Sequence, residues 1–469
     1  MSEDLRSYLK ELKEAGEILQ IDKEVDTKTQ MGGLVWSAQN RRNKATFFTN
    51  LRGYPGWKAA SYLCGSRRRI SLGLKTTPEK FIPELRKRLE SGLTPCKIVK
   101  DGPVKEKKLL GKEADINKLP IHVMSALDGG PYIGSGISVV KDPESGIRNI
   151  SLHRNQMQGI KQLGILIHPG RHLDIVYKKY EEMNKPMPVA IFIGHHAVYY
   201  LASCWTTAFG IDELEIAGTL KGSPVELVKC ETIDLEVPAQ AEIVIEGELI
   251  PRERKEEGPF AEHTGYARAG GGLNPFIRVK AITMRKDAIY YALQGGRPIA
   301  ESQILDAMPM EVVLYNRIKE VGGNINLIDV LAPPYAGGCH IIVIQMVPEI
   351  EGQVKNALMA TLSSPYLHPK IAIAVDEDVD PHDPTELFWS ISTRVNPAKD
   401  IFIVPDTHGH HLDASLPMVT PKGAHPIIRL GSKMGIDATK PVTRLKEERD
   451  NFERSIPKGL DKFRLEDFL

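Results

Sequence analysis

The sequence lacks an excess of charge, a long apolar run and any closely spaced pair of cysteines. Its 61 Lys and Arg residues nearly balance its 60 Asp and Glu residues, so the formal net charge of +1 favours neither nucleic acid nor an anionic membrane as a partner. No apolar run approaches the roughly 18–20 residues that span a bilayer. The five cysteines show no CxxC spacing, which predicts neither a disulfide framework nor a thiolate zinc site. We therefore expect a cytoplasmic protein that acts on a small molecule.

The length of 469 residues exceeds the size at which one hydrophobic core keeps growing, so we expect an α/β protein of several domains. Residues 1–112 predict an N-terminal α/β domain whose first segment is an amphipathic helix, not a signal peptide. Residues 113–305 contain β-rich segments separated by Gly, Pro and Asp, which predict a sheet or barrel. Helices and strands alternate over residues 306–440, which predicts a mainly parallel sheet covered by helices. The amphipathic pattern of residues 441–469 predicts a terminal helix that contacts a neighbouring subunit.

Two glutamates five positions apart raise the question of an acid/base pair. Glu257 and Glu262 lie in the segment "EEGPFAEHTGY". A regular helix or strand would turn them to different sides. Because Gly258 and Pro259 break regular structure, an irregular loop could bring the two carboxylates together. From the spacing alone, a solvated surface turn remains the alternative.

A polar strand-like segment begins at Asn149. Alternation places Asn149, Ser151 and His153 on one face of the strand, and Leu152 and Arg154 on the other. An amide, an imidazole and a carboxylate from another part of the chain could together hold a divalent cation that also binds a phosphate. Polar residues of an exposed strand that bind no ion remain the alternative.

Two further clusters give weaker signals. His408, His410 and His411 lie in "DTHGHHLD", where they could bind a metal, line a pocket or belong to an ordinary loop. The acidic segment "VDEDVDPHDP" lacks the glycine and glutamate of a calcium-binding loop, and is typical of helix capping and solvation. The glycine-rich segments do not fit a dinucleotide-binding fingerprint.

The sequence resembles the UbiD family of prenylated-FMN-dependent decarboxylases in six segments whose order and spacing both match: "NISLHR", "HPGRH", "IDELEIAGTLKGSPVELVKC", "LEVPAQAEIVIEGEL", "EGPFAEHTGY" and "GSKMGIDAT". The resemblance runs from the first helix to about residue 440. It implies that the central domain is a split β-barrel, like that of flavin reductases, which binds prenylated FMN between two α/β domains. It also implies reversible, non-oxidative decarboxylation of an aromatic, heteroaromatic or α,β-unsaturated acid through a covalent adduct with the cofactor.

The resemblance places a catalytic trio on Arg154, Glu257 and Glu262. A guanidinium suits the task of orienting a substrate carboxylate, because it is planar and stays charged. We expect Glu262 to donate the proton and Glu257 to fix Arg154. Burial and a second carboxylate raise the pKa of Glu262, whereas Arg154 opposes that rise.

The resemblance also implies cofactor and substrate contacts. The ligands of Mn²⁺ or Mg²⁺ are Asn149, Glu213 and a histidine, for which we favour His172 over His168. The residues that would serve K⁺ are Ala202, Ser203 and Glu213. The residues expected at the flavin are Ser151, Leu152, His153, Arg154, Arg171 and His172, with Lys370 near its phosphate. The polar candidates for the substrate pocket are Gln294, His340 and His410, which favour a polar or heteroaromatic acid over a styrene-type acid.

Several alternatives stay open within this family. The chain could act as a carboxylase, or as the aryl-CoA or phenolic-acid decarboxylase subunit of a larger complex. A non-catalytic flavin-binding protein is a further alternative, although such a protein would not need an acid/base trio. The implied partners are a flavin prenyltransferase that supplies the cofactor, and further copies of the chain in a homodimer or homohexamer.

Overall fold

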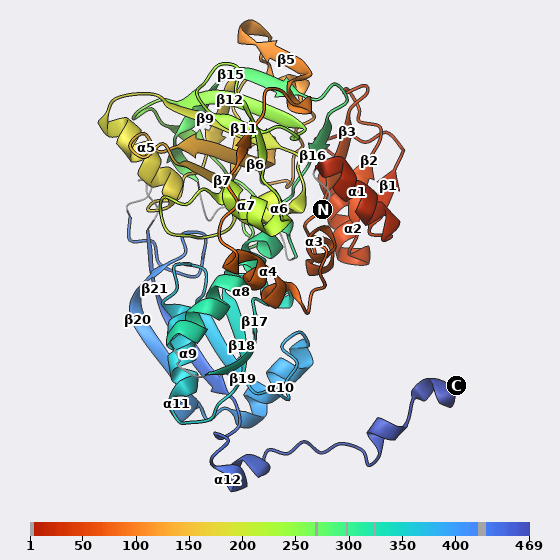
Figure 1. The fold of residues 1–469 in the computed structure, drawn as a ribbon, viewed down its shortest axis with the longest axis vertical. Coiled ribbons are helices and arrows are strands. Elements are labelled where there is room, and N and C mark those ends of the chain that lie inside the picture. The colour runs from red at the N-terminus through yellow and green to blue at the C-terminus, as the bar shows by residue number, and fades with distance from the viewer. Residues whose placement is uncertain (1–3, 268–270, 297–298, 322–324, 421–427) are drawn as a thin grey trace.

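The computed structural model describes residues 4–267, 271–296, 299–321, 325–420 and 428–469, and shows a mixed α/β architecture with a barrel in the middle of the chain (Figure 1). This confirms the predicted fold class. Within the described ranges, no helix combines the length and the apolar character that a membrane span requires.

The N-terminal part contains a four-stranded sheet in the order β1-β2-β3-β16. Its strands are β1 (Ile18–Ile21), β2 (Ala45–Phe48), β3 (Lys58–Ser61) and β16 (Ile289–Tyr291). Its helices are α1 (Leu5–Glu14), α2 (Met31–Arg42), α3 (Arg67–Gly73) and α4 (Phe81–Glu90). The predicted first helix is present as α1, which buries its apolar face into a core shared with the barrel. Because β16 pairs with β3, the chain returns to this sheet after it has formed the barrel.

The barrel consists of six antiparallel strands in the order β12-β9-β6-β7-β8-β15, and it closes because β12 also pairs with β15. These strands are β6 (Tyr132–Lys141), β7 (Arg148–Met157), β8 (Gln162–Ile165), β9 (Met187–Ile193), β12 (Ile243–Leu249) and β15 (Phe276–Met284). Closure leaves the six strands without a free edge. The helices of this part are α5 (His172–Glu182), α6 (Ala197–Ser203) and α7 (Glu213–Lys221).

Short strands add to this central part: β4 (Lys97–Ile98), β5 (Lys107–Leu110), β10 (Glu226–Lys229), β11 (Glu236–Pro238), β13 (Lys255–Glu257) and β14 (Gly272–Asn274). Strand β5 pairs with β15, and β4 pairs with β10. The central part therefore begins near residue 97, earlier than the expected boundary at residue 113.

The C-terminal sheet has the order β17-β18-β19-β21-β20. Its elements are α8 (Glu301–Val321), β17 (Asn326–Leu331), β18 (Ile341–Val347), α9 (Gln353–Leu362), β19 (Ile371–Val375), α10 (Pro384–Arg394), α11 (Pro397–Asp400), β20 (Ile401–Gly409) and β21 (Arg429–Ala438). The prediction of a mainly parallel sheet is wrong: β19 is parallel to both its neighbours, but the outer pairs β17/β18 and β20/β21 are antiparallel. A crossover helix, α9, joins the parallel strands β18 and β19, whereas only a 3-10 turn lies between β17 and β18.

The last residues leave the body of the molecule as an extended tail (Figure 1). Helix α12 spans only Lys446–Asp450, so the prediction of one continuous terminal helix is wrong for the single chain. Ile456, Phe463 and Phe468 are between 62% and 72% exposed. An amphipathic helix gains most of its stability by packing its apolar face, and these side chains stay uncovered here. The contact of the tail with a neighbouring subunit remains a prediction.

Candidate active site

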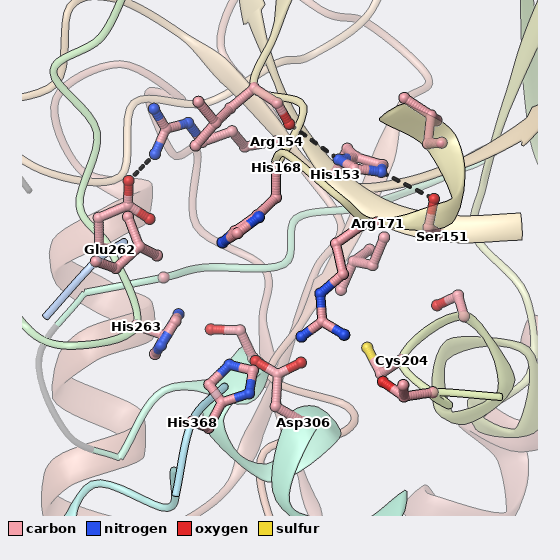
Figure 2. Close-up of a pocket in the computed structure, with 18 of the residues that line it drawn as sticks. Ser151, His153, Arg154, His168, Arg171, Cys204, Glu262, His263, Asp306 and His368 are labelled. Atoms are coloured by element: carbon pink, nitrogen blue, oxygen red, sulfur yellow. Dashed lines mark hydrogen bonds and ion pairs between the residues drawn. The ribbon is translucent and has the colours of Figure 1, made fainter. Parts of the chain in front are cut away.

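A cavity of about 290 Å³ lies where the barrel meets the C-terminal part. One wall is formed by β7 and the loop after β8, and the opposite wall by α8 and by loops next to the C-terminal sheet (Figure 2). Residues from widely separated segments therefore face one partly open cavity.

Arg154 on β7 lies between Glu257, the last residue of β13, and Glu262 in the loop that follows. Its Nε donates to Glu257 Oε1 at 2.9 Å and its Nη2 to Oε2 at 2.6 Å, while its Nη1 forms an ion pair with Glu262. All three side chains are buried. The guanidinium also stacks over the Phe260 ring, 4.9 Å from its centroid. One buried cation therefore holds two carboxylates, and of these Glu262 lines the cavity.

The irregular loop after Glu257 makes this convergence possible. Gly258 has φ of +101°, which favours glycine over residues with a side chain. The loop is then tied to the segment before β6, because the carbonyl of Pro259 accepts from Gly129 N at 2.8 Å and Ala261 N donates to Asp128 Oδ1 at 2.8 Å. Regular strand pairing ends at Glu257, and Glu262 turns back toward Arg154.

A second polar group surrounds Glu213 at the start of α7. Its carboxylate accepts from Asn149 Nδ2 and from Ile150 N, both at 2.9 Å, and His172 Nδ1 lies 3.5 Å from Oε1. Burial raises the pKa of Glu213, while the hydrogen bond from His172 lowers it. Asn149 Oδ1 is buried and has no hydrogen-bond partner among the described residues. His168, the other predicted ligand, lies next to His411, and the two ring centroids are 4.0 Å apart.

The predicted flavin contacts on β7 line the cavity. Ser151 Oγ lies 2.8 Å from His153 Nε2, so these two side chains share one face of the strand. Burial lowers the pKa of His153 to about 4. Arg171 points into the cavity near Asp306 (Figure 2), and burial lowers the pKa of its guanidinium although Asp306 opposes this. Within the described residues, the Arg171 side chain donates no hydrogen bond.

Five predicted site residues do not line the cavity: Glu257, which pairs with Arg154 behind the wall, and Lys370, Gln294, Ala202 and His340. The Lys370 amine donates to Asp413 at 2.9 Å and to Ser415 at 2.8 Å. Gln294 Nε2 donates to a main-chain carbonyl at 3.2 Å, and the carbonyl of Ala202 accepts from a main-chain N–H of the next turn. His340 lies behind the wall, with its ring 5.8 Å from that of His410. The wall does include His410, Ser203 and Glu213.

The cavity wall also contains Asp306, His263 and His368, for which no role was predicted, beside the predicted His410. Burial raises the pKa of Asp306 to about 7, although Arg171 opposes the rise. The position of Asp306, as the acid within the otherwise apolar run Ile304–Met310, is the signal that could have identified it. Burial lowers the pKa of His263 to about 3, and burial together with neighbouring histidines brings the pKa of His368 and of His410 well below the usual range. This end of the cavity is therefore lined by neutral imidazoles at pH 7.

The chain matches the 3-octaprenyl-4-hydroxybenzoate carboxy-lyase family in three consecutive domains: the N-terminal domain over residues 9–89, the Rift-related domain over 97–298 and the C-terminal domain over 303–438. It is 32% identical over 453 residues to a phenolic acid decarboxylase of Bacillus subtilis, with 94% of this chain and 93% of that protein covered.

Solved structures of the UbiD class share the fold. The enzyme HmfF from Pelotomaculum thermopropionicum in complex with FMN has a TM-score of 0.88 and 36% identity, with 99% of this chain and 100% of that chain covered. An evolved dimeric form of HmfF in complex with prFMN has a TM-score of 0.86 and 34% identity, with all of both chains covered. The resemblance inferred from the sequence motifs is thus confirmed, and the chain is a carboxy-lyase that belongs to the UbiD family.

Proposed function

We propose that the chain catalyses non-oxidative decarboxylation of an aromatic, heteroaromatic or α,β-unsaturated carboxylic acid with prenylated FMN as cofactor. The observation that carries this proposal is the buried arrangement of Arg154 between Glu257 and Glu262 at the cavity wall. Two relatives support the reaction class and the cofactor: a phenolic acid decarboxylase, and a structure in complex with prFMN.

The cavity has donors that suit a flavin and a divalent cation. Arg171 offers a cationic side chain to a phosphate or a flavin carbonyl. The oxygen of Asn149 has no hydrogen-bond partner in the described part of the chain. Together with the Glu213 carboxylate and the His172 imidazole it forms a donor set for Mn²⁺ or Mg²⁺ next to a phosphate. This geometry supports His172 over His168 as the nitrogen ligand. We place K⁺ near Ser203 and Glu213. When bound, prenylated FMN supplies the electron sink that amino-acid side chains lack.

The hydrogen bonds of Arg154 support different roles for Glu257 and Glu262. Glu257 occupies both Nε and Nη2, so it fixes the plane of the guanidinium. Its Nη1 pairs with Glu262, so a substrate carboxylate that approaches Nη1 would meet this group together with Glu262. A substrate oriented at Nη1 would lie beside Glu262, which we assign as the proton donor to the carbon that loses CO₂. The role of Glu257 is to position Arg154.

The test is to co-express the chain with a flavin prenyltransferase, record its ultraviolet-visible spectrum, and screen phenolic and heteroaromatic acids for CO₂ release and for H/D exchange in the product. Glu262→Gln should keep the flavin spectrum and lose turnover. Glu256→Gln is a matched control, because Glu256 is an exposed glutamate in the same segment. Retained CO₂ release by a flavin-loaded Glu262→Gln variant would refute the assignment of the proton donor.

A further inference from the structure

Six histidines gather where the barrel meets the C-terminal part, and the proposed reaction gives a chemical step to none of them. Each ring centroid lies no more than 5.8 Å from that of another histidine in the group. The six are His168, His263, His340, His368, His410 and His411. They come from loops that are far apart in the sequence, so the fold itself assembles the group.

Three of these histidines bring one ring nitrogen each close together. One nitrogen each of His263, His368 and His410 lies within 4.8 Å of the other two. The rings of His368 and His410 are stacked at 4.2 Å, and the His263 ring lies 5.5 Å from that of His410. All three residues line the cavity, and Figure 2 shows His263 and His368 facing its interior.

Two of the ring nitrogens in this trio have no partner in the protein. His263 Nε2 and His368 Nδ1 are buried and make no hydrogen bond within the described residues. His410 Nδ1 accepts from Leu412 N at 3.3 Å, which is long for a hydrogen bond and is easily exchanged for a stronger interaction. Each residue is at most 9% exposed. A buried polar atom without a partner is unfavourable, so a ligand that binds these nitrogens relieves a cost already present in the fold.

We propose that His263, His368 and His410 form a second cation site, for a divalent transition metal of the zinc type. Three neutral imidazoles and an open fourth position toward the cavity are the donor set of an open zinc site. Nitrogen ligands around tetrahedral Zn²⁺ lie about 3.3 Å apart, given Zn–N bonds of about 2.0–2.1 Å. Rotation of the side chains therefore has to bring the nitrogens about 1.5 Å closer at most.

The donor atoms separate this site from the one at Glu213. The group around Glu213 offers two oxygen ligands and one nitrogen, which suit Mn²⁺ or Mg²⁺, whereas three imidazoles favour zinc, copper or nickel. Because Zn²⁺ binds a given site more tightly than Mn²⁺, the site at Glu213 has to be filled with Mn²⁺ first, and the histidine variants then show which site holds Zn²⁺.

Two other groups share one member with the proposed trio: Asp306 with Cys339 and His368, and His168 with His410 and His411. Each of these contains a residue that is only half-buried, whereas the proposed trio is buried throughout. The carboxyl of Asp306 also interacts with Arg171, a competing cation. The trio of His263, His368 and His410 is thus the best formed of the three.

An ion at this site would occupy the end of the cavity opposite β7. We expect it to compete with the acid for space, so that Zn²⁺ raises the apparent KM without lowering kcat. This consequence rests on the proposed function, whereas binding of the ion does not.

The binding test uses the untagged full chain loaded with Mn²⁺ and prenylated FMN, in equilibrium dialysis against Zn²⁺. We expect one Zn²⁺ per chain in addition to Mn²⁺. His263→Asn and His368→Asn should each weaken Zn²⁺ binding roughly 100-fold, while the Mn²⁺ content and the circular dichroism spectrum stay unchanged. The control variants are His411→Asn, from the neighbouring group, and His382→Asn, whose side chain is 47% exposed; both should bind Zn²⁺ like the parent.

X-ray absorption at the zinc edge of the parent protein gives a second measurement, which does not depend on the folding of a variant. Imidazole nitrogens at about 2.0–2.1 Å support the site. The proposal is overturned if the zinc shell contains only oxygen, if His263→Asn and His368→Asn bind Zn²⁺ like the parent, or if only His411→Asn loses it. Because dialysis and absorption need no substrate, they can be interpreted even if no acid is decarboxylated.

Discussion

Replacing Glu257 by glutamine tests whether a buried anion, and not only a hydrogen-bond acceptor, positions Arg154. The pair forms two hydrogen bonds of 2.9 and 2.6 Å, and the side chains are 6% and 0% exposed. Glutamine keeps one acceptor oxygen, but its amide group would place N–H donors against a guanidinium N–H. Breaking a buried ion pair costs about 3–5 kcal/mol of stability, and we expect the lower end because Glu262 still neutralises Arg154.

The expected kinetic effect follows from displacement of the guanidinium. A misplacement of about 1 Å costs roughly 10²-fold in rate, so kcat/KM of Glu257→Gln should fall by about that factor while some activity remains. Glu262→Gln should lose more, because it also removes the proton donor. The assays are CO₂ release by the flavin-loaded variants and thermal unfolding by circular dichroism, with Glu256→Gln as the control.

Two results would contradict this reasoning. Near-parental stability and kcat/KM in Glu257→Gln would show that Arg154 needs no second anion. A folded, flavin-loaded Glu257→Gln variant that is as inactive as Glu262→Gln would show that Glu257 takes part in proton transfer.

Three further predictions concern the metal site, the loop and a buried acid. Asn149→Ala should lose Mn²⁺ by elemental analysis and hold flavin less tightly; parental metal content would exclude Asn149 as a ligand. Gly258→Ala has to adopt φ of +101°, so it should destabilise the fold by about 1–3 kcal/mol in thermal unfolding and lower kcat; an unchanged thermal midpoint and rate would refute this. Burial raises the pKa of Glu301 to about 7, above an unfolded value near 4.3, so its stabilising contribution is complete below about pH 4 and is lost as the pH rises to about 7. Between pH 5 and 7, Glu301→Gln should therefore gain stability relative to the parent, by up to about 1.4 kcal/mol per pH unit; a difference that does not change with pH would argue against the raised pKa.

Local sequence patterns predicted the parts of the site that lie on one element. Alternation along β7 placed Ser151 and His153 on one face, where their side chains lie 2.8 Å apart. The break at Gly258 indicated an irregular loop. The contact between Arg154 and Glu257 joins residues 103 positions apart, so only the resemblance to a family pointed to it.

The features that the sequence did not predict depend on contacts between residues that lie far apart in the chain. The antiparallel edges of the C-terminal sheet depend on connections whose direction local periodicity does not encode. The Lys370 amine donates to Asp413 and Ser415, which follow β20 and lie more than 40 positions after Lys370 in the chain. The tail has a helical pattern, but in the single chain only Lys446–Asp450 is an α-helix, because its apolar side chains stay exposed.

The two walls of the cavity carry different side chains. We expect the barrel side to serve the reaction and the C-terminal side to select the substrate. The barrel side supplies the charged groups, Arg154 with its glutamates and Glu213 with its neighbours, which suit steps common to every carboxylic acid. The C-terminal side supplies His368 and His410, buried and neutral, which can donate or accept a hydrogen bond but add no charge. We expect a ring substituent that reaches these two histidines to be selected by its hydrogen-bonding groups, whereas Asp306, on the same wall, is a group that can carry a charge. We expect substitutions at His410 to change which acid is accepted, whereas substitutions at Arg154 should lower the rate for all of them.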